Sequence, residues 1–149
     1  MKMARGRRRH WSDPIMASNY PLLMLAFFFG DAHGVVLACS AIASLLYHRS
    51  AETECLEVDR ALAMAAFLSS LALMRTAAAR PGIFLLLLAD IFLAFVALNY
   101  SNKRGPREKK TRRTLDNPGY NLWHTAWHLF IVAGQILLLI AKTSPPLLP

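Results

Sequence analysis

The chain has 149 residues, of which 55% are hydrophobic, and its formal net charge at pH 7 is +8. Its mean hydropathy of +0.33 is more apolar than a soluble domain of this length needs. The basic excess is confined to two short segments, and no basic domain with interleaved aromatic residues accompanies it, which argues against a nucleic-acid partner. We therefore expect a single transmembrane domain, residues 1–149, whose basic segments bind anionic lipid headgroups.

The first apolar segment follows a basic N-terminal segment, residues 1–18, and runs over residues 20–48. It is longer than a helix needs to cross the hydrocarbon core, which takes about 20 residues. Gly30 and Gly34 interrupt it. We expect one transmembrane helix with a kink at these glycines, and the alternative is a short interfacial piece followed by a span.

Three further apolar segments have the length of a transmembrane helix, residues 59–79, 82–100 and 120–142. A short loop, residues 49–58, precedes the first of them, and a basic loop, residues 101–119, precedes the last. Pro81 and Gly82 form the remaining turn, because proline cannot continue the helical hydrogen bonds and glycine relieves the turn. The sequence thus predicts an all-α integral membrane bundle of about four transmembrane helices.

Counting the crossings places the polar residues of these helices at one membrane face. The first helix ends with His48, the second begins with Asp59, and the last begins with His124 and His128. Residues four apart share a face of a helix, so Ser44 joins His48, and the last two histidines point at a common object. Because ionisable groups are costly in a membrane, such a cluster indicates a functional site.

Histidines converging from two helices match the ligands of a catalytic zinc ion, which takes three imidazole nitrogens at about 2.0–2.1 Å and leaves a fourth position for water. We therefore expect Zn2+ as the cofactor and His48, His124 and His128 as its ligands. Asp59 is then free to orient the water and accept its proton. Ser44 can donate a hydrogen bond to the water or the substrate.

The same five residues resemble the CREST superfamily of membrane hydrolases. This group includes alkaline ceramidases, the progestin and adipoQ receptors, GPI-anchor lipid-remodelling proteins and bacterial haemolysin-type proteins. The resemblance rests on S-x3-H at the end of one helix (Ser44, His48), an aspartate at the start of the next (Asp59), and H-x3-H in the last (His124, His128). The stretch YHRSAETECLEVD is similar to the serine, histidine and acid stretch of the GPI-remodelling branch.

The resemblance implies that the three histidines bind zinc, that Asp59 and Ser44 hold the water, and that the reaction cleaves a lipid amide or ester. Membrane lipid is accordingly the expected partner. The family has seven membrane helices, whereas this sequence predicts about four. The resemblance therefore implies a shorter version without most of the helices that close the lipid pocket, and catalysis depends on whether the remaining helices supply one.

Two other interpretations of the histidines stay open. His124 and His128 are flanked by tryptophans, as in an interfacial belt with polar tips in the headgroups. The main functional alternative is a non-enzymatic membrane subunit, whose histidines are structural or hold a haem between His48 and His124. His33 lies about 16 Å along the helix axis from Ser44, so we leave it out of the site.

Asp90 lies in the middle of the predicted helix 82–100, where a carboxylate must be neutral or paired, so we expect a structural contact to Gln135, Ser69 or Ser70. A four-helix core is small, which also suggests a homo-oligomer or a partner membrane subunit. We expect an endomembrane location, in the ER or Golgi. A mitochondrial membrane is the alternative, because the Arg-rich N-terminus has no acid before Asp13.

Overall fold

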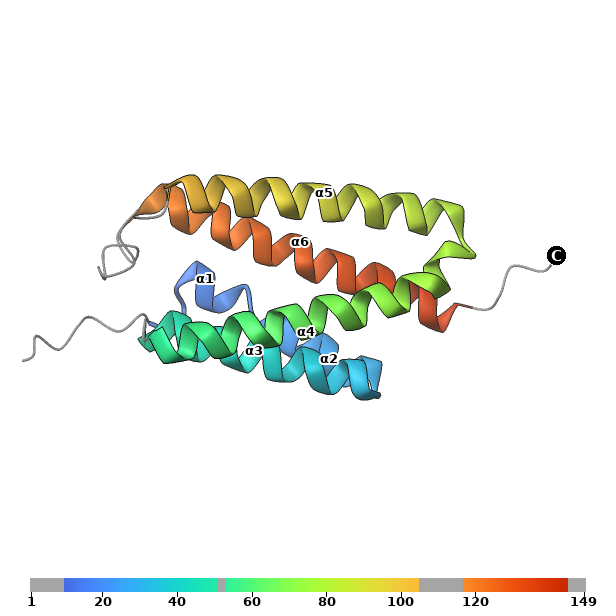
Figure 1. Ribbon diagram of the computed structural model, residues 1–149, viewed down its shortest axis with the longest axis horizontal. Coiled ribbons are helices and arrows are strands. Elements are labelled where there is room, and N and C mark those ends of the chain that lie inside the picture. Colours follow the sequence, from blue (N-terminus) through green and yellow to red (C-terminus); the bar gives the residue numbers. More distant parts are fainter. Residues whose placement is uncertain (1–9, 51–52, 105–116, 145–149) are drawn as a thin grey trace, which may run out of the picture.

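The computed structural model describes residues 10–50, 53–104 and 117–144, and within them all regular structure is helical (Figure 1). Three of these helices are long and apolar enough to cross a membrane. The predicted all-α bundle is confirmed, and the apolar helices indicate an integral membrane protein. In chain order the helices are α1 (Pro14–Ala17), α2 (Tyr20–Phe29), α3 (Ala32–Ser50), α4 (Thr53–Ala78), α5 (Pro81–Arg104) and α6 (Pro118–Thr143).

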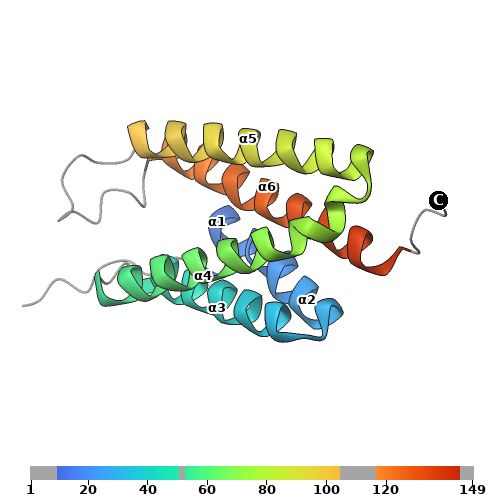
Figure 2. The ribbon, with the colours of Figure 1, turned by 45° about the vertical axis from the view of Figure 1, so that its right-hand side comes forward.

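The first apolar segment forms two helices. The C-cap of α2 is Gly30, whose φ of 64° lies in the left-handed region that glycine adopts without strain. The chain then reverses, and α3 runs back along α2 as the second arm of a helical hairpin (Figure 1 and Figure 2). The predicted single kinked helix over residues 20–48 is therefore wrong, because a left-handed C-cap ends a helix, whereas a kink needs continuing helical backbone.

Gly34 lets the two arms of this hairpin approach each other closely. A Cβ at Gly34 would lie 2.4 Å from the carbonyl oxygen of Ala26 and 3.2 Å from the Cβ of Phe29. Small residues allow such backbone contact between membrane helices. The second glycine that interrupts the segment thus serves packing, while the first serves the turn.

The long helices alternate in direction through the bundle. α3 packs along α4, α5 packs along α6, and α6 also contacts α2 and α4. The end of α3, the start of α4, the end of α5 and the start of α6 therefore meet at one end of the bundle, on the left in Figure 1. We call this end the histidine end, because it holds His48 near the end of α3 and His124 and His128 near the start of α6. The crossing count predicts the polar residues to lie at this end.

The boundaries of α4 and α5 differ from the predicted ones. α5 continues to Arg104, past the predicted end at residue 100. α4 begins at Thr53, so most of the predicted loop 49–58 is helical. Glu57 and Arg60, which are three residues apart on α4, form an exposed ion pair of 3.1 Å, a contact that supports a helix in this charged stretch. Residues 1–9 of the basic N-terminal segment and residues 105–116 of the basic loop lie outside the described residues.

Two cationic side chains hold the opposite end of the bundle. Lys142 of α6 donates to the carbonyl oxygen of Phe29 at 2.8 Å and pairs with Asp31 at 2.7 Å, which ties α6 to the α2–α3 turn. The hydrogen bond from Lys142 holds the pKa of Asp31 below its usual range. Arg80, from the α4–α5 turn, donates to two carbonyl oxygens near the end of α6. Cations at this position also complement the partial negative charge of a helix C-terminus.

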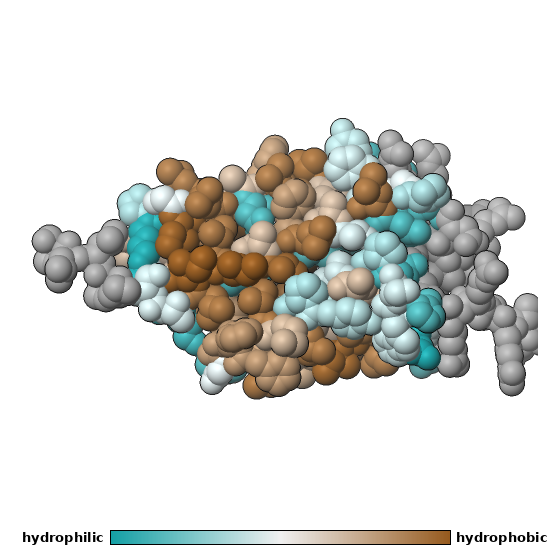
Figure 3. Space-filling model, turned by 180° about the vertical axis from the view of Figure 1, so that it is seen from behind, coloured by the Kyte–Doolittle hydropathy of each residue, from teal (hydrophilic) through white to brown (hydrophobic). Residues whose placement is uncertain are grey.

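On the face shown in Figure 3, apolar side chains cover the middle of the bundle, and hydrophilic residues gather toward its two ends. On α5 the exposed large apolar residues include Leu85, Leu86, Phe92 and Phe95. An exposed apolar band between two polar ends matches the hydrocarbon core of a bilayer, which is about 30 Å thick.

Asp90 of α5 does not make the contact predicted for it, which is to Gln135, Ser69 or Ser70. Its carboxylate instead lies against Gly134 of α6, where an added Cβ would be 2.6 Å from Asp90 Oδ2. The reason is the direction in which the side chains of α6 point. α5 faces the side of α6 that carries Gly134, whereas the next residue, Gln135, is turned by about 100° around the helix axis and faces α4.

The polar residues expected near Asp90 form a separate network around His33 of α3. His33 meets Ser69 Oγ at 2.8 Å through Nδ1 and donates to Gln135 Oε1 at 2.8 Å through Nε2. Gln135 Nε2 in turn donates to Ser70 Oγ at 2.9 Å. These contacts join α3, α4 and α6 and satisfy the polar atoms of His33 and Gln135 inside the bundle.

We predict that Gly34→Ala lowers the stability of the folded protein by about 1–3 kcal/mol, because the new methyl group forces α3 away from the α2 backbone. Thermal melting of the purified protein in detergent measures the effect. Gly82→Ala is the matched control, since an added Cβ there meets nothing within 4 Å. Equal melting temperatures for the two variants would show that the close α2–α3 contact is not made.

Candidate metal centre

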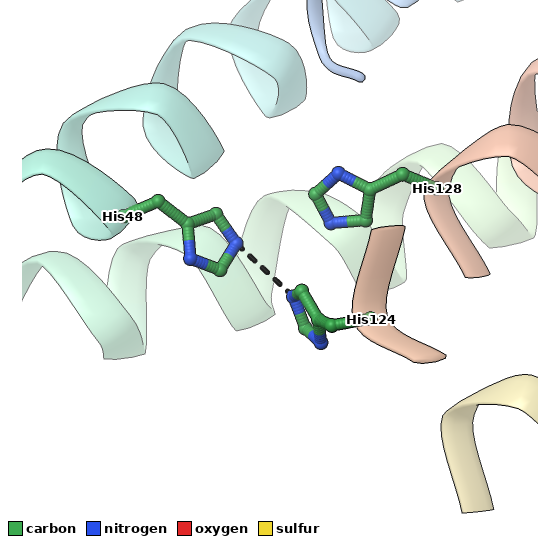
Figure 4. A group of neighbouring side chains, drawn as sticks. All are labelled: His48, His124 and His128. Carbon is green, nitrogen blue, oxygen red and sulfur yellow. Dashed lines mark hydrogen bonds between the residues drawn. The ribbon is translucent and has the colours of Figure 1, made fainter. Parts of the chain in front are cut away.

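Three histidines meet inside the bundle, one near the end of α3 and two in the first half of α6 (Figure 4). His48, His124 and His128 are only 5%, 8% and 6% exposed. Their ring nitrogens therefore face one another and other buried groups rather than lipid headgroups. This arrangement differs from that of an interfacial belt, whose polar tips are exposed.

The start of α6 sets the direction in which its two histidines point. Asn117 caps the helix by accepting a hydrogen bond from the Tyr120 N–H at 3.0 Å, and Pro118 occupies the first turn. The helix then continues without interruption, so His124 and His128 lie one turn apart on one face. That face is directed toward the end of α3 (Figure 4).

The spacing of the three rings fits a metal ion. One ligand atom from each histidine can be chosen so that all lie within 4.8 Å of one another. Nε2 of His124 and Nε2 of His48 are 3.1 Å apart. Two nitrogens bound at about 2.0–2.1 Å in a tetrahedral site stand roughly 3.3–3.4 Å apart, so this pair needs only a small movement. The group could therefore hold a metal ion.

The contact between His48 and His124 places a proton where a metal ion would bind. For the two Nε2 atoms to share a hydrogen bond, one must carry a proton that the other accepts. A metal ion needs the lone pair of each Nε2, so its binding must move that proton off Nε2, either to Nδ1 of the same ring or to solvent.

Two serines that the sequence did not single out contact the far side of the rings. Ser18 Oγ, at the end of α1, lies 3.0 Å from His128 Nδ1, and Ser101 Oγ, on α5, lies 3.2 Å from His124 Nδ1. Both serines are buried. Hydrogen bonds of this kind orient the rings of metal-binding histidines. Since each serine is distant in sequence from its histidine, no motif or helical spacing could have revealed the pair.

Ser44 and Asp59 lie beside the histidines rather than among them. Ser44 is buried one turn before His48 on α3, and its hydroxyl is placed to donate a hydrogen bond to the Asp59 carboxylate of α4. Asp59 is half-buried and does not belong to the ligand group found among the described residues. The acid is thus connected to the site through the helix face that carries His48.

Aromatic rings surround the histidines at this end of the bundle. Tyr120 stacks on His124 with ring centroids 5.0 Å apart, and Trp127 lies 5.1 Å from both His124 and His128. Tyr47 approaches His48 at 4.9 Å. Tyrosine and tryptophan are enriched where membrane meets water, so these rings favour a position of the site near the membrane interface.

Comparison of the chain with protein-family models, with curated proteins and with solved structures gives no match. The class of protein is therefore defined by the fold and the site: an all-α membrane bundle with a buried group of three histidines that could hold a metal ion.

We predict that the purified protein binds about one divalent transition-metal ion per chain, and that His128→Ala abolishes this binding because two protein ligands rarely retain the ion. Elemental analysis after dialysis gives the stoichiometry. His33→Ala is the control, because His33 is a buried histidine that is hydrogen-bonded outside the cluster. Metal retained by the His128 variant, or lost equally by both, would rule out the assigned ligands.

Proposed function

We propose that this protein is a zinc-dependent membrane hydrolase that cleaves lipid amide or ester bonds. The observation that carries the proposal is the meeting of three buried imidazoles from two helices at one end of the bundle. The resemblance of Ser44, His48, Asp59, His124 and His128 to the CREST superfamily supports the same reaction class.

The donor set favours a transition metal such as zinc over Mg2+ and Ca2+. All three candidate ligands are imidazoles, whereas Mg2+ and Ca2+ are held mainly by oxygen ligands. Three protein ligands are also the number found in catalytic zinc sites, because the fourth position is left for water. When bound, zinc supplies a Lewis acid that lowers the pKa of water to about 7.

The neighbouring side chains have the chemistry that hydrolysis requires. Asp59 can accept the proton of the attacking water, since it is joined through Ser44 to the helix face that carries His48 and does not belong to the ligand group. Ser44 has one hydroxyl proton, which it can donate either to the Asp59 carboxylate or to the oxygen of the substrate carbonyl as negative charge develops there. Aromatic rings pack against His48, His124 and His128 and so limit the movement of these imidazoles.

The position of the site suits a lipid substrate whose headgroup linkage lies at the membrane interface. A lipid places its amide or ester carbonyl between the headgroup and the chains, at the depth where interfacial aromatic residues lie. An endomembrane location, in the ER or Golgi, accords with this substrate class. The carboxylate of Asp90, half-exposed within an apolar helix, is consistent with assembly into a homo-oligomer or with a partner membrane subunit.

The non-enzymatic alternative, in which a haem lies between His48 and His124, has less support from the geometry. A haem iron bound from both faces separates its two axial nitrogens by roughly 4 Å and places the ring between the imidazoles. These two nitrogens are in direct contact at 3.1 Å. A visible spectrum of the purified protein distinguishes the two functions, because a Soret band would favour haem and a colourless zinc-containing protein would favour hydrolysis.

We predict that zinc-loaded wild-type protein releases fatty acid from one of three lipid classes: ceramides, glycerolipids or GPI lipids. Asp59→Ala should lower this activity by about 10²–10⁴-fold because it removes the proton acceptor, while metal affinity falls only about 10–100-fold. Asp31→Asn is the control, since that carboxylate lies at the opposite end of the bundle. The hydrolase proposal fails if the zinc-loaded wild type releases fatty acid from none of these lipids.

A further inference from the structure

The short helix α1 places one serine hydroxyl between a backbone carbonyl and a histidine of the metal centre. Ser18 Oγ donates to the carbonyl oxygen of Ile15 at 2.8 Å and lies 3.0 Å from Nδ1 of His128. Ser18 is 5% exposed, so water does not compete freely for either contact. The hydroxyl therefore has two defined partners of different kinds.

The direction of the Ser18 hydrogen bond determines which ring nitrogen of His128 carries a proton. A carbonyl oxygen can only accept, so the contact with Ile15 uses the single proton of the Ser18 hydroxyl. When the Ser18 proton is donated to Ile15, only the lone pairs of Ser18 Oγ face His128, and Nδ1 of His128 then donates. A neutral imidazole with its proton on Nδ1 has a free lone pair on Nε2.

This free lone pair points to the place where a metal would sit. One nitrogen of the His128 ring is turned away from the other histidines, and the second faces the gap between them (Figure 4). Since Nδ1 is held by Ser18, the nitrogen in the gap is Nε2. The opposite tautomer would place a proton on the nitrogen that has to bind the ion.

The surroundings of α1 hold Ser18 in position. Ile15 and Met16 are fully buried, and Asp13 caps the helix by accepting from the Ile15 N–H at 3.0 Å. Asn19 Nδ2 donates to the same Ile15 carbonyl at 2.9 Å, which orients the acceptor of Ser18. A four-residue helix with two fully buried side chains and a capped start is anchored well enough to orient a neighbouring ring.

We propose that Ser18 is a positioning residue that keeps His128 in the Nδ1–H tautomer and so makes α1 part of the metal centre. Its role in metal binding rests on the proposed zinc site, whereas its effect on the tautomer does not. Without the hydroxyl, the described contacts of His128 no longer fix the proton on Nδ1, and a share of molecules carries it on Nε2. Zinc must then displace that tautomer before it binds.

The experiment measures the tautomer and zinc affinity separately. Histidine is labelled with 15N, and the ring nitrogens of His128 are observed by NMR in the metal-free protein in detergent. Zinc affinity is measured by competition with a chelator, with Zn2+ as the probe. Wild type should show His128 protonated at Nδ1. Ser18→Ala should show a mixture of tautomers and bind Zn2+ about 10–100-fold more weakly. Ser18→Thr keeps a hydroxyl and should retain wild-type behaviour.

Ser69→Ala is the matched control, because it removes a serine contact of 2.8 Å to Nδ1 of another buried histidine, His33. It should leave both the His128 tautomer and the zinc affinity unchanged. A wild-type His128 protonated at Nε2, or a Ser18→Ala variant with unchanged tautomer and affinity, would overturn the proposal. If Ser18→Ala does not fold, the wild-type spectrum and Ser18→Thr still decide it. A wild type with the expected tautomer but no zinc binding overturns the zinc site and its function, and supports the role of Ser18 in setting the tautomer.

Discussion

The contact between His48 and His124 is the interaction on which the arrangement of this bundle depends. It joins α3 to α6 through two buried imidazoles, whose Nε2 atoms are 3.1 Å apart, in a bundle with many exposed large apolar side chains. Polar groups inside a membrane are costly unless they are paired, so the two helices cannot separate without exposing both rings. Around this contact the other polar residues of the histidine end are ordered: His128 beside it, serines behind the rings, and Asp59 reached through Ser44.

Stability and function share this end of the molecule, while the other polar contacts serve to hold the helices. The His33 network joins α3, α4 and α6 through hydrogen bonds that leave the ring nitrogens of His33 no capacity for a ligand. Lys142 and Arg80 tie the far end of α6 to the adjoining turns. The histidine cluster differs because its Nε2 atoms face one another, so a metal ion can replace the hydrogen bond between them.

The lengths of the apolar segments were enough to predict the bundle, and the positions of His48, His124 and His128 were enough to predict their convergence. Helices alternate in direction, so residues at successive ends must meet. The reversal at Gly30 could not be predicted, because a glycine inside an apolar run is compatible with a kink or with a left-handed cap. Ser18 and Ser101 could not be predicted either, since their contacts depend on how α1 and α5 pack against α6. Packing of α5 on Gly134 likewise decided the surroundings of Asp90.

X-ray absorption at the zinc edge of the purified, zinc-loaded protein tests the ligand set itself, because it reports the atoms bound to the metal. We expect a four-coordinate site with three imidazole nitrogens and one oxygen at about 2.0–2.1 Å. Replacement of His48 should reduce the imidazole contribution or remove the metal. A zinc–sulfur distance of about 2.3 Å, which would point to Cys39 or Cys55, or a spectrum unchanged in the His48 variant, would contradict this ligand set.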